Sequence, residues 1–174
     1  MANIVQKTYG CSDTITIPSN VKYITITPVY ENSVVTYDSN SALYSLFIDA
    51  YNGLYGWGYN GSGQLGLFDT TDRSFPVQVG SYLNYWTQVS FGRSHFLSIQ
   101  SNGTLWAWGY NNYGQLGLSD TTNRYSPVQV GALSVWTQLS GGYYSTLGIQ
   151  SNGTLWACGY NLNGQLGLSD LTHR

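Results

Sequence analysis

The chain repeats its own sequence with a period of about 50 residues. Residues 101–124 recur as residues 151–174 with 19 of 24 positions identical, and residues 57–80 match residues 108–131 at 18 of 24 positions. The chain therefore contains two nearly complete units and an incomplete third, at 51–100, 101–150 and 151–174. A single fixed period predicts that every unit folds into the same supersecondary structure and that neighbouring units stack on one another.

Each unit carries signals for β-strands. Asn-Gly separates two apolar runs, Phe96–Ile99 and Leu105–Trp108 in the second unit, and this dipeptide is a strong cue for a tight hairpin. Both alternating faces of Leu105–Trp108 are apolar, which indicates a strand covered on both sides. Two shorter extended stretches follow at 127–130 and 135–139, and no 3.6-residue apolar period is present. We therefore predict an all-β fold of four-stranded propeller blades, with hairpin turns at Asn52-Gly53, Asn102-Gly103 and Asn152-Gly153.

The fixed elements of the unit resemble a known repeat. In the second unit they are Gly92–Ile99, Asn102-Gly103, Trp108–Asn111 and Gly114–Gly117, in this order. Over residues 41–174 the pattern is similar to the regulator of chromosome condensation repeat. This resemblance implies a β-propeller, usually of seven blades, each a four-stranded sheet. The chain holds about 2.7 such repeats, so we expect a longer polypeptide or another chain to complete the ring.

Two positions depart from the family pattern. The family's histidine occurs once, at His95, and we interpret it as a polar anchor at the start of a strand. Cys158 replaces a tryptophan that the other two units carry, Trp57 and Trp108. The resemblance also offers an alternative function, nucleotide exchange on a small nuclear GTPase with docking on chromatin. We expect that activity to be absent, because the chain lacks a basic docking surface.

The first forty residues do not follow the repeat. Residues 14–17 and 23–27 alternate apolar and polar side chains around a Pro-Ser-Asn turn, which predicts two strands. We favour a separate β-module at 1–40 that attaches the protein to a larger assembly, ahead of the repeats at 41–174. The alternative is a divergent half-blade, with residues 35–37 standing where 86–88 stand later. The opening segment also resembles the amino-terminal β-segments of bacteriophage tail and virion proteins.

Charged residues make up only 8% of the chain, and the net charge is -2. An average soluble domain carries about a quarter charged residues. The six Lys and Arg residues are scattered, so we expect neither nucleic acid nor an anionic membrane as a partner. The chain contains no run of 18 apolar residues, so we predict no membrane insertion. Cys11 and Cys158 lack Cys or His neighbours at metal-binding spacing, and we interpret both as free thiols.

The residues that recur in the repeat are predicted to build the blades. Aspartate can cap a loop backbone and pair with an arginine four positions on, and this pair recurs in every unit. The predicted structural set is Trp57, Trp108, Gln64, Gln115, Gln165, Asp69, Asp120, Asp170, Arg73, Arg124 and Arg174. The other carboxylates form no repeated pair for acid and base catalysis, and neither histidine has a metal or nucleophile motif. We predict no catalytic residue, no metal, no cofactor and no enzymatic activity.

Tyrosines outside the repeated core positions are the remaining candidates for a surface binding site: Tyr82, Tyr85, Tyr113, Tyr143 and Tyr144. Aromatic rings among Asn and Gln can stack on sugars or on a partner protein. We predict a structural or binding protein that associates with other proteins, or with copies of itself, in a larger assembly. A virion surface or the extracellular space is the expected location, with the cytoplasm left open. A glycan-binding module is the alternative.

Overall fold

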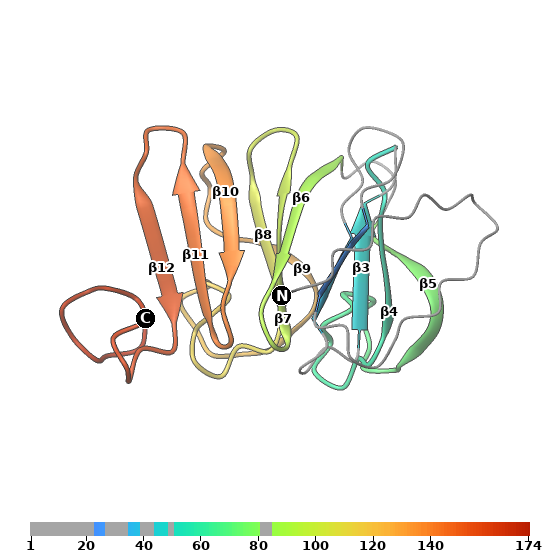
Figure 1. Ribbon diagram of the computed structural model, residues 1–174, viewed down its shortest axis with the longest axis horizontal. Coiled ribbons are helices and arrows are strands. Elements are labelled where there is room, and N and C mark those ends of the chain that lie inside the picture. Colours follow the sequence, from blue (N-terminus) through green and yellow to red (C-terminus); the bar gives the residue numbers. More distant parts are fainter. Residues whose placement is uncertain (1–22, 27–34, 39–43, 49–50, 81–84) are drawn as a thin grey trace, which may run out of the picture.

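The computed structural model describes residues 23–26, 35–38, 44–48, 51–80 and 85–174, and all regular structure within these ranges is β-strand (Figure 1). Three antiparallel sheets of five, four and three strands stand side by side, and strands neighbour one another in chain order. The all-β prediction is confirmed. The first sheet contains β1 (Tyr23–Ile26), β2 (Val35–Asp38), β3 (Tyr44–Ile48), β4 (Leu54–Gly58) and β5 (Arg73–Val79). The second contains β6 (Trp86–Phe91), β7 (His95–Gln100), β8 (Leu105–Gly109) and β9 (Arg124–Gln129), and the third β10 (Trp136–Gly141), β11 (Ser145–Gln150) and β12 (Leu155–Gly159).

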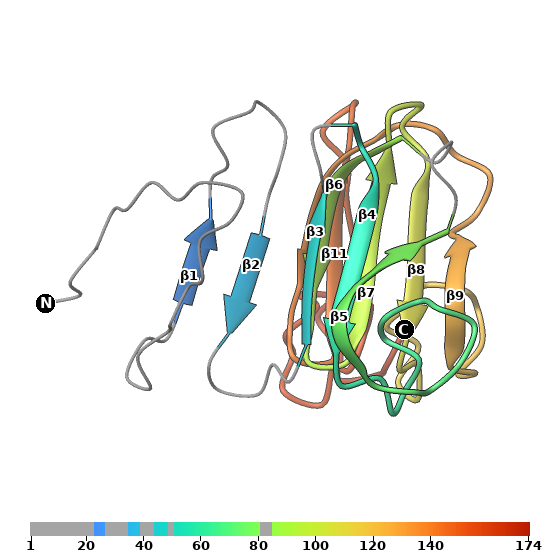
Figure 2. The same ribbon diagram turned by 90° about the vertical axis from the view of Figure 1, so that its right-hand side faces the viewer.

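The sheets approach one another through their early strands. β6 packs against β3 of the first sheet and against β10 of the third. β5 and β9 are the last strands of their sheets; Figure 2 looks along the stack and shows β9 on the side away from β3 and β6, with β5 curving toward that side. Sheets that face one another in this way, with successive strands leading outward, have the arrangement of propeller blades.

The sheets are out of phase with the sequence repeat. The unit 51–100 supplies β4 and β5 to the first sheet and β6 and β7 to the second, so each complete unit bridges two sheets. In the first sheet β2 pairs with β3 in the place where β6 pairs with β7 in the second. The sheet therefore crosses the boundary predicted at residue 40. A separate attachment module stays a prediction: β1 falls within the predicted 23–27 strand, and the other predicted strand, 14–17, lies outside the described residues.

The predicted hairpin turns follow the Asn-Gly pairs. At Asn102-Gly103 the backbone N–H of Gly103 donates to the carbonyl of Gln100 at 2.8 Å, and Gly103 has a φ of 79°. A residue with a side chain would be strained in this left-handed conformation, which glycine adopts readily. Gly153 takes the same conformation with a φ of 84°. In the first unit the pair Ile48–Leu54 corresponds to Ile99–Leu105, so Asn52 stands at the position of Gly103 and is the left-handed residue there, with a φ of 64°.

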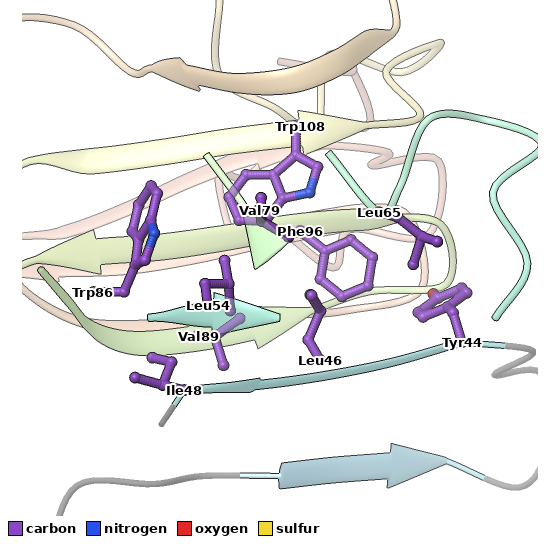
Figure 3. Close-up of a cluster of buried hydrophobic side chains, with 10 residues drawn as sticks. All are labelled: Tyr44, Leu46, Ile48, Leu54, Leu65, Val79, Trp86, Val89, Phe96 and Trp108. Atoms are coloured by element: carbon purple, nitrogen blue, oxygen red, sulfur yellow. The ribbon is translucent and has the colours of Figure 1, made fainter. Parts of the chain in front are cut away.

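The main hydrophobic core lies between the first and second sheets. Figure 3 shows its ten buried side chains: Tyr44, Leu46, Ile48, Leu54, Leu65, Val79, Trp86, Val89, Phe96 and Trp108. The rings of Phe96 and Trp108 stack with centroids 5.8 Å apart and an interplanar angle of 19°. Two smaller clusters form where the second sheet meets the third, around Leu97, Ala107 and Leu116 and around Ile99, Leu105 and Trp136. The strand β8 thus buries side chains on both of its faces, as the sequence predicts.

The long loops at 59–72 and 110–123 are each also bonded to the sheet that follows them. The indole Nε1 of Trp108, in β8, donates to the carbonyl of Gln64 in the loop before β5, at 2.9 Å. In the third sheet the equivalent loop carbonyl, that of Gln115, accepts from Thr146 Oγ1 at 2.7 Å and from Cys158 Sγ at 3.5 Å. Thr146 and Cys158 stand where the second sheet has Phe96 and Trp108. The contact between the loop at 110–123 and the third sheet therefore keeps a hydrogen bond but has less apolar packing.

Candidate functional site

Three long loops, at 59–72, 110–123 and 160–173, leave the sheets at the same end (Figure 1). Each loop folds around one fully buried asparagine, Asn60, Asn111 or Asn161. In the second loop Nδ2 of Asn111 donates to the backbone carbonyls of Asp120 and Thr122 at 2.9 and 3.2 Å. Its Oδ1 accepts from the N–H of Leu116 at 2.9 Å. Because a single side chain ties together three points of the loop backbone, the loops hold a fixed shape.

The predicted structural glutamines and aspartates also lie in these loops and their arginines directly follow them, whereas Trp57 and Trp108 lie in β4 and β8. Oε1 of Gln64, Gln115 and Gln165 accepts from the backbone N–H two residues earlier, at 2.8 to 3.0 Å. Each Asp–Arg pair forms an ion pair, with distances of 2.6, 2.5 and 2.5 Å for Arg73–Asp69, Arg124–Asp120 and Arg174–Asp170. The hydrogen bond from the arginine is the main cause of the lowered pKa of Asp69 and of Asp120. For Asp170, the main cause of the lowered pKa is the hydrogen bond from the backbone N–H of Thr172. These pairs are solvent-accessible, so they shape the loops more than they stabilise the fold.

Aromatic side chains from the loops and turns meet at this end of the second and third sheets. This tyrosine patch consists of Tyr110, Tyr113, Tyr143, Tyr144, Tyr160 and His173. Tyr113 is at its centre, with ring centroids 5.0 Å from Tyr144, 5.1 Å from Tyr160 and 5.4 Å from His173. Backbone bonds across the strand ends set the arrangement: the N–H of Tyr160 donates to the carbonyl of Tyr144 at 2.8 Å. Most of these rings are partly buried, and Tyr143 is exposed.

Arg93 lies beside the patch, in the turn between β6 and β7. Its Nη1 donates to the hydroxyls of Tyr143 and Tyr144, the latter at 3.0 Å. The guanidinium carbon also lies 4.8 Å from the ring centroid of Tyr143, within cation–π range. A hollow of about 290 Å³ opens next to it, lined by Tyr44, Tyr59, Ser62, Arg93, Ser94, Tyr110 and Tyr144. Burial raises the pKa of Tyr110, one of the residues that line this hollow.

The structure groups three of the five tyrosines that the sequence singled out. Tyr113, Tyr143 and Tyr144 belong to the patch. Tyr85 lies at the opposite end of β6 from Arg93, where its carbonyl accepts from the N–H of Ser101 beside a hairpin turn. Tyr82 lies outside the described residues.

Sequence reasoning missed Arg93, Tyr110 and Tyr160. The two tyrosines occupy positions that recur in the repeat. Trp108 also occupies a recurring position and is a buried core residue, so recurrence indicated a core position rather than a surface site. Their position could have distinguished them, because each directly follows the glycine that ends a strand. A side chain just past a strand end lies at the edge of the sheet, where loops from neighbouring blades meet.

His95 begins β7 and is completely buried. Its Nε2 lies 3.1 Å from Thr146 Oγ1, which in turn donates to the Gln115 carbonyl. Because the Thr146 hydroxyl gives its proton to that carbonyl, Nε2 of the imidazole is the donor to Thr146 Oγ1. Burial lowers its pKa to about 4, and Nδ1 has no hydrogen-bond partner within the described part of the chain. The geometry makes His95 a link between the second and third sheets.

We expect the protein to lose stability as the pH falls from 6.5 to about 4. In this range the unfolded chain protonates His95 and the folded chain does not, so unfolding takes up a proton and becomes easier. The loss from pH 7 to pH 4.5 is about 2–3 kcal/mol. Urea titrations at several pH values measure it, and His95→Gln is the control that should remove this component. An equally steep fall in the variant would contradict the assignment to His95. The lowered aspartate pKa values act only below about 4.

Within the described ranges, no group of three or more His, Cys, Asp or Glu residues could hold a metal ion. Nor do the described residues include a helix that is long and apolar enough to cross a membrane. Cys158 is a free thiol, and burial raises its pKa to about 11. Cys11 lies outside the described part of the sequence. The predicted lack of catalytic residues and cofactors stays a prediction.

Residues 52–99 and 102–149 match the family model described as the regulator of chromosome condensation (RCC1) repeat, and a second RCC1 repeat model matches 86–115 and 136–165. The chain belongs to the RCC1 repeat family. The resemblance of the repeat elements to this family is thereby confirmed. The resemblance of the opening segment to phage proteins stays a prediction.

This RCC1-repeat chain is similar to parts of longer proteins. It is 38% identical over 104 residues to the ultraviolet-B receptor UVR8 of Arabidopsis thaliana, covering 59% of this chain and 24% of the receptor. It is 31% identical over 120 residues to the probable E3 ubiquitin-protein ligase HERC4 of Mus musculus, covering 68% of this chain and 11% of the ligase. The chain therefore spans a quarter or less of these relatives.

A solved structure supports the fold. A chain in the crystal structure of Kap60 bound to yeast RCC1 (Prp20) superposes with a TM-score of 0.71 and 14% identity, covering 90% of this chain and 48% of that chain. At this identity the likeness concerns the fold alone. The three sheets are consecutive blades of an RCC1-type β-propeller.

Proposed function

We propose that this RCC1-repeat chain is a binding module whose tyrosine patch, together with the hollow at Arg93, contacts a partner protein. The observation that carries the proposal is the convergence of six aromatic side chains with one arginine at the meeting point of neighbouring blades. Tyrosine and arginine are enriched at protein interfaces, because they combine large contact areas with hydrogen bonds.

The comparisons support a binding role in general terms. UVR8 is named as a receptor, and yeast RCC1 was crystallised in a structure with Kap60. The patch is also supported by rigid loops, since the buried asparagines fix the backbone from which Tyr113 and Tyr160 project. A rigid surface loses little conformational entropy when a partner binds.

The test is a selection of binders from a displayed protein library against the full chain. We expect Tyr113→Ala to weaken the dominant group of binders at least tenfold, because Tyr113 contacts four other rings of the patch. Tyr85→Ala is the matched control, since it removes a half-exposed tyrosine at the other end of the sheet. Circular dichroism checks that both variants remain folded. Binders that tolerate Tyr113→Ala but are lost with Tyr85→Ala would refute the proposal.

Glycan binding remains a second candidate, favoured by the hydroxyls that line the hollow beside tyrosine rings. Such a surface can stack on one face of a sugar and hydrogen-bond to its hydroxyls. A glycan array separates the two candidates: selective retention of a sugar by the wild type but not by Tyr113→Ala would favour this reading over a protein partner.

The location on a virion and the anchoring role of residues 1–40 also remain proposals. They rest on the low charge and on the opening segment, most of which lies outside the described residues. GTPase regulation is the third candidate. Three of the four described arginines are already paired with aspartates, which leaves little positive charge for such a docking surface.

A further inference from the structure

Arg93 differs from the other arginines of the described chain in its electrostatic environment. Arg73, Arg124 and Arg174 each pair with an aspartate four residues earlier. Arg93 has no carboxylate within ion-pair distance among the described residues, and its neighbours are tyrosine hydroxyls and rings. Its positive charge is therefore solvated but not neutralised by the described part of the protein.

The contacts of Arg93 hold the side chain in place and leave one edge available. Both side-chain hydrogen bonds of Arg93 to described residues use Nη1, and its backbone N–H donates to the Tyr143 carbonyl at 3.2 Å. Neither Nε nor Nη2 forms a hydrogen bond with any described residue. These two nitrogens carry the pair of parallel N–H donors that binds a carboxylate in a bidentate manner. An arginine fixed by stacking and hydrogen bonding loses less entropy when it forms such a pair.

The hollow beside Arg93 fits a single protruding side chain. Its volume is about 290 Å³, and its lining is polar, with hydroxyl groups from serines and tyrosines. Tyr110 and Tyr144 belong to both the hollow and the tyrosine patch, so the two surfaces are continuous. A ligand anchored at Arg93 can thus extend its flanking groups over aromatic rings.

From this geometry we propose that Arg93 receives the side-chain carboxylate of a glutamate or aspartate in a partner peptide, while flanking aromatic residues of that peptide pack on the tyrosine patch. The inference rests on the proposed function and names the chemistry of its partner. The peptide is favoured over a small anion because the patch offers stacking area beyond the hollow itself. The aromatic rings of the bound peptide and of the tyrosine patch shield the bond between the carboxylate and Arg93 from water. This bond is therefore stronger than an exposed ion pair.

The test uses NMR titration of the full chain with two blocked peptides, Ac-Gly-Tyr-Glu-Tyr-Gly-NH₂ and its glutamine counterpart. We expect the glutamate peptide to bind at least fivefold more tightly and to shift the Arg93 Nε–H resonance. Arg93→Gln should abolish the preference while leaving the weaker aromatic contact. Arg124→Gln is the matched control, because that guanidinium is already paired with Asp120, and it should leave the preference intact.

Four results would overturn the inference. The first is equal binding of the two peptides by the wild type, and the second is a glutamate preference that survives in Arg93→Gln. The third is sodium glucuronate shifting Arg93 at lower concentration than the glutamate peptide, which would assign the site to a sugar acid. A selected protein partner that is lost with Tyr113→Ala but tolerates Arg93→Gln would refute this inference and leave the proposed function standing.

Discussion

Replacing Trp108 with alanine is expected to destabilise the protein by about 4–5 kcal/mol, one of the largest effects of any single substitution in the described chain. The indole is fully buried between the first two blades, where it stacks on Phe96. Its removal leaves a cavity in the main core and also leaves the Gln64 carbonyl without its donor. Guanidinium unfolding followed by far-UV circular dichroism measures the change.

Trp156→Ala is the matched control for this substitution. Trp156 lies in the third sheet, is 53% exposed and makes one edge-to-face contact with Trp136. We expect its loss to cost about 1 kcal/mol. Trp108→Phe separates packing from hydrogen bonding, since it keeps most of the ring and removes the N–H. Equal losses for Trp108→Ala and Trp156→Ala would show that the blade interface contributes less than its burial indicates.

Asn111→Ala is expected to destabilise the protein by about 3 kcal/mol, although it removes only a small polar side chain. The substitution leaves the Leu116 N–H and the carbonyls of Asp120 and Thr122 without their partner. Asn111→Asp should be at least as damaging, because it places a carboxylate beside the carboxylate of Asp120. Urea unfolding of the three proteins measures both effects.

The neighbouring residue offers the control for this prediction. Asn112 has the same side chain in the same loop but is exposed, so Asn112→Ala should change the free energy of unfolding by less than about 0.5 kcal/mol. Matching losses for the two alanine variants would mean that the loop does not depend on its buried asparagine.

The tyrosine patch should also lose partner binding in Asn111→Ala, because Tyr110 and Tyr113 project from this loop.

The sequence by itself determined the features that depend on residues close together in the chain. Asn102-Gly103 closes a hairpin because only a few adjacent residues are needed to form the turn. Asp120 pairs with Arg124 because a spacing of four residues within one loop brings them together. The apolar alternation of Leu105–Trp108 likewise predicted a strand buried on both faces, since strand geometry alone sends successive side chains to opposite sides.

The tertiary structure decided which of these elements meet. Tyr113 and Tyr144 are far apart in sequence, and they come into contact because the second and third sheets stack with their loops at one end. Tyr85, equally aromatic, is carried to the other end by the direction of β6. The bond from Trp108 to the Gln64 carbonyl and the placement of Arg93 against Tyr143 also cross from one blade to the next. Such contacts depend on how sheets pack and on the direction of each strand, which is set by the summed burial of many side chains rather than by any local motif.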